Sequence, residues 1–169
     1  LKTVVCEGDK RFTATAVIIA TGTVERTLGI PGEMEMIGRG VSFCAVCDAA
    51  FYRNKPVVIV GAGNSAFEES LYLAEFASHI TILARSDKYA AEEITQQKVK
   101  ANSKITILPF RQSLEVVIEN GKVAGMRVLN TQTNEEEIIP ANGIFPYIGA
   151  APVTQVVKDL GITNAEGYL

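Results

Sequence analysis

The chain has 169 residues, of which 47% are apolar and 21% charged, a balance typical of a globular domain and unlike that of a disordered chain. The formal net charge of -3 and the lack of a basic stripe argue against a nucleic-acid partner. No apolar run reaches the roughly 18 residues that a membrane helix needs, and no signal-peptide pattern stands at the start. We therefore expect a cytoplasmic protein that has no membrane span.

The first 40 residues predict short strands followed by an irregular stretch. Strands are expected at 2–6, 10–14 and 15–21, the last being a continuous apolar run of the kind buried in a sheet. Residues 22–40 are rich in glycine and show no sustained hydrophobic period, which predicts a linker. The chain starts at Leu1, without methionine and with strands already in progress, so we expect it to be a fragment of a longer protein.

From residue 56 onwards the pattern becomes that of a βαβ unit. A β-branched strand is followed by a glycine turn, an amphipathic helix and a second strand, and a polar helix and a third strand extend the same parallel sheet. The expected ranges are 56–60 (strand), 65–78 (helix), 79–84 (strand), 87–103 (helix) and 104–109 (strand).

The next part of the chain alternates apolar and polar residues. Asn120-Gly121 is a favoured two-residue hairpin turn, so residues 112–130 and 135–143 predict a three-stranded antiparallel meander. A further strand is expected over 143–149, followed by a short helix and an unfinished strand. The sequence therefore predicts an α/β fold: a Rossmann-like nucleotide-binding domain with a parallel sheet and a meander.

A phosphate-binding loop follows the first strand of the βαβ unit. Residues 61–66 read GAGNSA and match the pattern G-x-G-x-x-A. Gly61 permits the tight turn, Gly63 lets the backbone approach a pyrophosphate, and Ala66 allows close packing of the helix on the sheet. The N–H groups near Asn64 and Ser65, at the helix start, would face the phosphates. Because strand, turn, helix and second strand occur in order, we favour dinucleotide binding over a merely structural glycine turn.

The end of the second strand bears on the choice of nucleotide. An acidic residue there holds the ribose 2′-hydroxyl of NADH, and a basic residue holds the 2′-phosphate of NADPH. Here Ala84 stands in the place of the acid and Arg85 follows it. This single arginine favours NADPH over NADH.

The three cysteines include a Cys-x-x-Cys pair, Cys44 and Cys47. Such a pair indicates either redox chemistry or half of a metal site. A structural zinc ion needs four ligands, and the chain otherwise offers only Cys6 and His79, neither at a motif-like spacing, so no metal is expected. A redox pair is favoured. Asp48 follows directly and either moves protons during exchange or caps a turn.

Together these segments resemble the low-molecular-weight bacterial thioredoxin reductases, which are FAD-dependent pyridine nucleotide-disulphide oxidoreductases. The resemblance covers nearly the whole chain. It is carried by AVIIATGTVERTLGIPGE, by GRGVSFCAVCDAAFYRNKPVVIVGAGNSAFEESLYL and by NGIFPYIGAAPVT. The second of these is the most specific, because a Cys-x-x-Cys-Asp motif leads within one short run into the phosphate loop.

The resemblance implies a reaction and roles for individual residues. Electrons would pass from a reduced nicotinamide to FAD, then to the Cys44–Cys47 disulfide and on to thioredoxin. Cys47 would lie beside the flavin, Cys44 would attack the partner's disulfide, and Asp48 would be the acid-base residue. The implied nucleotide ligands are Gly61, Gly63, Asn64, Ser65, Ala66, Ile148 and Gly149. The full-length protein is expected to be a homodimer.

The sequence departs from the family pattern in the segment that contacts the 2′-phosphate. Relatives that use NADPH carry three arginines there, whereas this chain keeps only Arg85 and has Ser86 and Ala90 in the other two places. Three alternatives follow: weak binding of NADPH, tolerance of NADH, or another donor such as ferredoxin. Ala49 and Ala50 also replace a glycine and a phenylalanine after the redox motif.

The resemblance also implies a domain division. Residues 1–37 would close the first half of an FAD-binding domain, residues 38–148 would form the pyridine-nucleotide domain with the redox pair, and residues 149–169 would begin the return to the FAD domain. The glycine-rich FAD loop and the final FAD segment of the family are not in the sequence, so we expect weak FAD binding and an inactive fragment. The competing hypothesis is a nucleotide-binding module without turnover.

Overall fold

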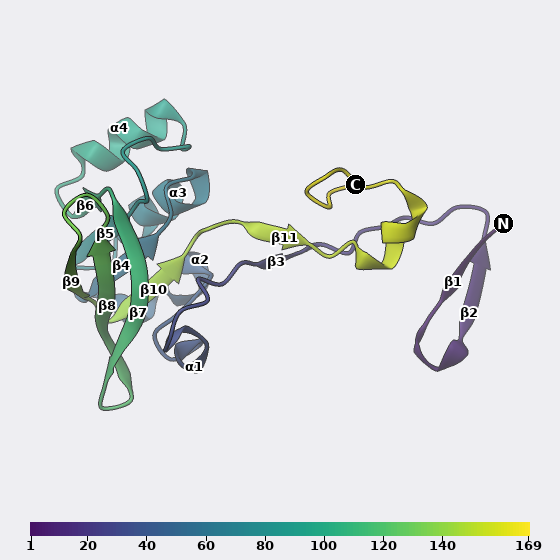
Figure 1. Ribbon diagram of the computed structural model, residues 1–169, viewed down its shortest axis with the longest axis horizontal. Coiled ribbons are helices and arrows are strands. Elements are labelled where there is room, and N and C mark those ends of the chain that lie inside the picture. The colour runs from purple at the N-terminus through teal and green to yellow at the C-terminus, as the bar shows by residue number, and fades with distance from the viewer. The chain divides into compact units, whose positions relative to one another are not determined.

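The computed structural model describes residues 1–169, which divide into two compact units (Figure 1). The larger unit is Glu25–Ala150, and the smaller combines Leu1–Val24 with Ala151–Leu169. The chain passes between the units within β3 (Thr23–Glu25) and β11 (Ala150–Pro152), which pair as a two-stranded sheet. No helix has the length and apolar character needed to cross a membrane.

A four-stranded parallel sheet forms the centre of the larger unit, in the order β10-β4-β5-β6. The strands are β4 (Pro56–Val60), β5 (His79–Leu83), β6 (Ile105–Leu108) and β10 (Gly143–Pro146). Helix α3 (Asn64–Leu73) connects β4 to β5, and α4 (Glu93–Ala101) connects β5 to β6. Val58 pairs with Thr81 on one side and Ile144 on the other, which fixes the register. The expected parallel sheet is confirmed.

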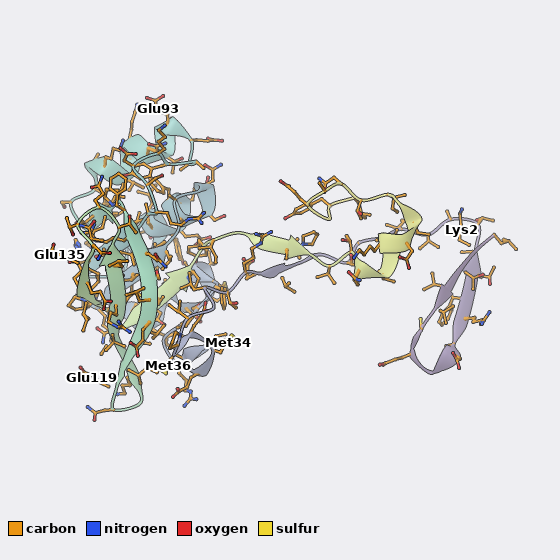
Figure 2. The ribbon with its side chains drawn as sticks, in the orientation of Figure 1. Lys2, Met34, Met36, Glu93, Glu119 and Glu135 are labelled. Atoms are coloured by element: carbon orange, nitrogen blue, oxygen red, sulfur yellow. A yellow bond between two sulfur atoms is a disulfide. The ribbon has the colours of Figure 1, made fainter.

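An antiparallel meander follows the sheet strands β4 to β6 along the chain. It consists of β7 (Arg111–Glu119), β8 (Lys122–Asn130) and β9 (Glu135–Pro140), with β8 in the middle. At the tip of the first hairpin, beside Glu119 (Figure 2), Asn120 and Gly121 both have positive φ, 50° and 71°. Positive φ at both central residues defines the tight hairpin turn that Asn-Gly favours. The predicted meander is confirmed.

The parallel sheet is buried on both faces, which explains why its strands read as continuous apolar runs. Helices α3 and α4 cover one face and the meander covers the other (Figure 1). Val57 and Ile59 point to the helix side, where they pack with Phe67, whereas Val58 packs with Met126 on the meander side. The alternation of Cβ direction along β4 therefore supplies two separate cores from one strand.

Residues 22–40, for which a linker is predicted, include the passage between the two units at Val24–Glu25 and a segment that packs on the larger unit. Helix α1 (Glu33–Met36) carries Met34 and Met36 (Figure 2), and Met36 is buried in the meander-side core. The carboxylate of Glu33 is fully buried and accepts hydrogen bonds from the N–H groups of Leu28 and Gly29, each at 2.8 Å. The sequence of this segment shows no hydrophobic period because specific polar contacts such as these, rather than an apolar helix or strand face, hold it in place.

In the smaller unit, the expected strands at the start of the chain are only partly present. β1 (Lys2–Val5) and β2 (Arg11–Ala14) pair as a hairpin, joined through a short turn of helix, η1 (Glu7–Asp9). The apolar run 15–21 forms no strand, and the Ile18 side chain is 93% exposed. This prediction is wrong, because a buried strand needs neighbouring strands and the structure provides none beside this run. The remaining short helical turn of this unit is η3 (Gln155–Leu160).

Two of the predicted helices are shorter than expected. α3 ends at Leu73 rather than residue 78, and α4 begins at Glu93 rather than residue 87. The N–H groups of Ala90 and Ala91 both donate to the carbonyl oxygen of Ala62, at 2.9 and 3.2 Å. These bonds hold the segment before α4 against the phosphate loop, and they exclude it from the helix.

Candidate redox and nucleotide site

The two cysteines of the Cys-x-x-Cys motif form a disulfide at the start of a short helix. α2 (Ala45–Asp48) begins directly after Cys44, so that one turn of helix brings Cys47 back to Cys44, with 5.3 Å between the Cα atoms. Cys47 is exposed, and Cys44 and Asp48 are half-buried. The structure therefore places these three residues together at the surface, where a partner can approach them.

Three backbone N–H groups of this turn donate to side-chain acceptors. The N–H of Cys44 donates to the Ser42 hydroxyl at 3.1 Å, and the N–H of Ala45 donates to the Tyr147 hydroxyl oxygen at 3.0 Å. The N–H of Cys47 donates to the sulfur of Cys44 at 3.2 Å. The sequence did not indicate Ser42 or Tyr147, and for Tyr147 no local signal exists because its partner lies 102 residues away.

A second feature of the larger unit is a cleft of about 820 Å³ at the carboxyl ends of the parallel strands. It is lined by Val60 at the end of β4, by Leu83 at the end of β5 and by Tyr147 directly after β10. From β4 the chain continues on one side to β5, whereas β10 returns on the other side. Such a switch point in the strand order is where open α/β sheets bind nucleotides.

The predicted phosphate loop lines this cleft and has the required geometry. Gly61 has φ of 139°, and a Cβ atom there would collide with the carbonyl oxygen of Tyr147. A Cβ atom on Gly63 would meet nothing within 4 Å, which leaves room for a ligand. No side chain caps α3, whose first amides near Ser65 therefore remain available to a phosphate. The exposed Ser65 and buried Ala66 lie where the motif predicts. The loop fits a pyrophosphate.

Asn64 has a structural contact in addition to its place in the loop. Its side-chain oxygen accepts a hydrogen bond from the N–H of Glu92 at 2.7 Å. The Asn64 amide nitrogen is thereby oriented away from Glu92, since the two ends of the carboxamide point in opposite directions. Asn64 therefore ties the phosphate loop to the segment that precedes α4.

The segment that should contact a 2′-phosphate lies along the same cleft. Arg85, Ser86, Lys88 and Ala90 all line it. The Ser86 hydroxyl closes a turn: it accepts the N–H of Lys88 at 3.3 Å and lies 3.1 Å from the Lys88 carbonyl oxygen, to which it donates. Arg85 is therefore beside a second exposed cation, Lys88, which the family pattern did not indicate.

Two further arginines line the cleft from other parts of the chain. Arg26 lies after β3, and its N–H donates to the carbonyl oxygen of Gly149 at 3.0 Å. Arg111 begins β7 and pairs with Glu137 at 2.7 Å. Neither was expected from the sequence, because the fold alone brings them to the cleft. The predicted Ile148 also lines the cleft, as does Gly149, which has φ of 99°.

Two half-buried ionisable groups are Tyr147, which contacts the redox turn, and Glu69 of α3. Burial raises the pKa of the Tyr147 hydroxyl, and the negative charge of Glu69 raises it further. Burial also raises the pKa of Glu69, followed by the effect of its neighbour Glu68. One carboxylate oxygen of Glu69 is buried without a hydrogen-bond partner. Tyr147 is therefore neutral over the physiological pH range and remains a good acceptor for Ala45.

The metal-ligating residue types do not gather in this structure. No group of three or more His, Cys, Asp or Glu side chains could hold a metal ion. Cys6 is an exposed free cysteine of the smaller unit, and His79 begins β5.

The fold, the Cys-x-x-Cys disulfide and the cleft at the carboxyl ends of the parallel strands are together typical of the pyridine nucleotide-disulphide oxidoreductase class. The model of the family described as "Pyridine nucleotide-disulphide oxidoreductase" matches residues 1–169, and the chain belongs to this family. Family membership implies FAD and a nicotinamide cofactor. The thioredoxin reductase of Bacillus subtilis is 46% identical over 98% of the chain and 52% of its own length. That of Listeria monocytogenes is 43% identical, with the same coverage.

Solved structures show the same relationship. The thioredoxin reductase of Lactococcus lactis, in a form designated the FR conformation, superposes with a TM-score of 0.89 at 42% identity, over 96% of this chain and 54% of its own. The thioredoxin reductase of T. acidophilum superposes with a TM-score of 0.87 at 34% identity, over 96% of this chain and 53% of its own. The chain thus spans about half the length of the curated relatives it matches.

Proposed function

We propose that this chain is the part of a thioredoxin reductase that carries the redox disulfide and binds the nicotinamide nucleotide. The observation that supports this most directly is the presence of the Cys44–Cys47 disulfide and the nucleotide cleft on one compact unit, Glu25–Ala150. We further propose that residues 38–148 act as the pyridine-nucleotide domain and that residues 1–37 and 149–169 belong to the FAD-binding domain.

The cysteines would have distinct roles in the reaction. FAD, when bound, supplies the route by which electrons from the reduced nicotinamide reach the disulfide. The Cys44 thiolate attacks the disulfide of thioredoxin and forms a mixed disulfide, and Cys47 then attacks Cys44 and releases the reduced partner. Asp48, half-buried beside Cys47, would accept and return the thiol protons. Cys47 would also have to approach the flavin when FAD is bound, and the exposure of its side chain is consistent with that role.

The cysteine roles can be tested with the chain alone, because thiol exchange needs no flavin. The chain contains no tryptophan, so tryptophan fluorescence in a mixture with a tryptophan-containing thioredoxin reports only on the partner. Cys47→Ser, reduced and mixed with oxidised thioredoxin, should accumulate a mixed disulfide through Cys44. Cys44→Ser should not. Equal trapping by both variants would contradict the assignment, and no exchange by the wild-type dithiol would contradict thioredoxin as the partner.

We propose NADPH as the nucleotide donor. Arg85 and Lys88 line the cleft where the 2′-phosphate is expected, although Ser86 and Ala90 leave fewer cations than the family pattern has. One charge-assisted contact contributes at least about 1.5 kcal/mol, which corresponds to a preference of about tenfold over NADH. Titration calorimetry with NADPH and NADH measures this preference, and Arg85→Ala should remove most of it. Equal affinities in the wild-type chain would contradict the proposal.

A second donor is supported by one structural neighbour. The structure designated a ferredoxin-flavin thioredoxin reductase from Clostridium acetobutylicum superposes with a TM-score of 0.56 at 31% identity, over 82% of this chain and 43% of its own. Ferredoxin becomes the favoured donor if calorimetry detects binding of neither nucleotide at millimolar concentration.

A further inference from the structure

The Tyr147 side chain forms a hydrogen bond to the redox turn from the end of the parallel sheet. Tyr147 follows β10 directly, and its N–H donates to the carbonyl oxygen of Val60 at 2.8 Å, which fixes its backbone to β4. Its hydroxyl oxygen accepts the N–H of Ala45, the first of the two residues between the cysteines, at 3.0 Å. Ala45 is only 1% exposed, so water cannot replace this contact.

The other side-chain contacts of the turn do not involve the N–H of Ala45, although its carbonyl oxygen accepts the backbone N–H of Ala49. Ser42 binds the N–H of Cys44, and the sulfur of Cys44 binds the N–H of Cys47. The bond from the N–H of Cys47 to the Cys44 sulfur lies within the disulfide ring, so it depends on the position of that sulfur. Once the disulfide is reduced, the two cysteines are no longer linked. The backbone bonds from Asp48 to Cys44 and from Ala49 to Ala45 remain, and the bond from Ala45 to Tyr147 is the one that ties the turn to the end of the parallel sheet.

We propose that Tyr147 is a positioning residue that holds the two thiols close together and thereby stabilises the Cys44–Cys47 disulfide relative to the dithiol. This inference rests on the proposed function for its biological meaning but not for its test. A structure that holds two thiols together favours formation of the disulfide. By thermodynamic linkage, the free energy by which the contact stabilises the disulfide equals the free energy by which the disulfide stabilises the contact. Removal of the phenolic oxygen should therefore make the disulfide easier to reduce.

The test is a redox titration of the 169-residue chain in dithiothreitol buffers of graded oxidised-to-reduced ratio. Reduction breaks the bond between the two sulfur atoms, with two electrons and two protons supplied by dithiothreitol, which closes into its own cyclic disulfide. Tyr147→Phe removes only the hydroxyl. Its equilibrium constant for disulfide formation should fall three- to tenfold, which is about 15 to 30 mV for a two-electron couple.

Tyr89→Phe is the matched control. The Tyr89 ring is half-buried against Phe67, and it makes no hydrogen bond to the redox turn. It should leave the equilibrium constant unchanged within twofold. A Tyr147→Phe value that also lies within twofold of the wild type would overturn the proposal. Thioredoxin is absent from this titration, so its outcome is independent of whether thioredoxin is the substrate.

A second measurement needs no variant and covers the case in which Tyr147→Phe does not fold. Hydrogen exchange of the Ala45 amide, followed by NMR on the reduced wild-type chain, should show protection of at least tenfold over the rate of an unstructured peptide. Exchange at the unprotected rate in the reduced state would also overturn the proposal, because Tyr147 would then not hold the dithiol form.

Discussion

Removal of the buried Glu33 carboxylate should strongly destabilise the larger unit. Glu33→Ala leaves the N–H groups of Leu28 and Gly29 without their acceptor, in a place that water does not reach, since Glu33 is 0% exposed. Hydrogen bonds to a charged group contribute about 1.5 to 3 kcal/mol each. We expect the free energy of unfolding to fall by about 3 to 5 kcal/mol, out of the roughly 5 to 15 kcal/mol typical of a domain.

Urea denaturation followed by far-UV circular dichroism at 25 °C and pH 7 measures this loss. With an m-value of about 2 kcal/mol/M, the midpoint should fall by about 2 M. Glu33→Gln keeps one acceptor oxygen and should lose about half as much. Glu35→Ala is the matched control, because Glu35 is exposed on the same helix, and it should change stability by less than about 0.5 kcal/mol. A loss below about 1 kcal/mol in Glu33→Ala would refute the assigned role of the carboxylate.

Three further changes have defined outcomes. Gly61→Ala forces positive φ on a residue with a Cβ atom and drives that atom into the Tyr147 carbonyl, so a loss of about 2 to 5 kcal/mol in urea denaturation and weaker NADPH binding in calorimetry are expected. Gly143→Ala overlaps the Tyr52 ring and should cost about 1 to 3 kcal/mol, with a smaller loss in a Tyr52→Leu background. The raised pKa of Glu69 means that folding disfavours its charged form. The wild type should therefore lose stability relative to Glu69→Gln as pH rises from 4 to 7, and parallel unfolding curves over that range would contradict this.

The parallel sheet, the meander and the phosphate loop could be predicted because their signals are local. Strand β4 and the Asn120-Gly121 turn can each be recognised from a few consecutive residues. The differences have physical causes. Residues 15–21 are apolar enough for a buried strand but have no neighbouring strand, and α4 begins late because Ala90 and Ala91 bond to Ala62. Within residues 22–40, the polar contacts of Glu33 produce no hydrophobic period that the sequence could show.

The candidate site divides in the same way. The Cys-x-x-Cys pair is readable because one helical turn joins its members. Tyr147 is not, because its role depends on β10 returning beside β4. Arg26 and Arg111 reach the cleft only through the folding of β3 and β7, and no spacing rule connects them to Arg85.

The backbone around Ala90 is held by hydrogen bonds that do not depend on its side chain. The N–H of Ala90 donates to the carbonyl oxygen of Ala62, and this bond does not involve the side chain at position 90. Ala90 is also exposed, so a longer side chain there has room. Ser86 differs, because its hydroxyl itself closes the turn with Lys88. A longer side chain at position 90 would therefore leave the backbone contacts of the segment in place, whereas replacement of Ser86 would remove the hydrogen bonds that close the turn. The charge along this side of the cleft can thus change at position 90 while the scaffold stays the same.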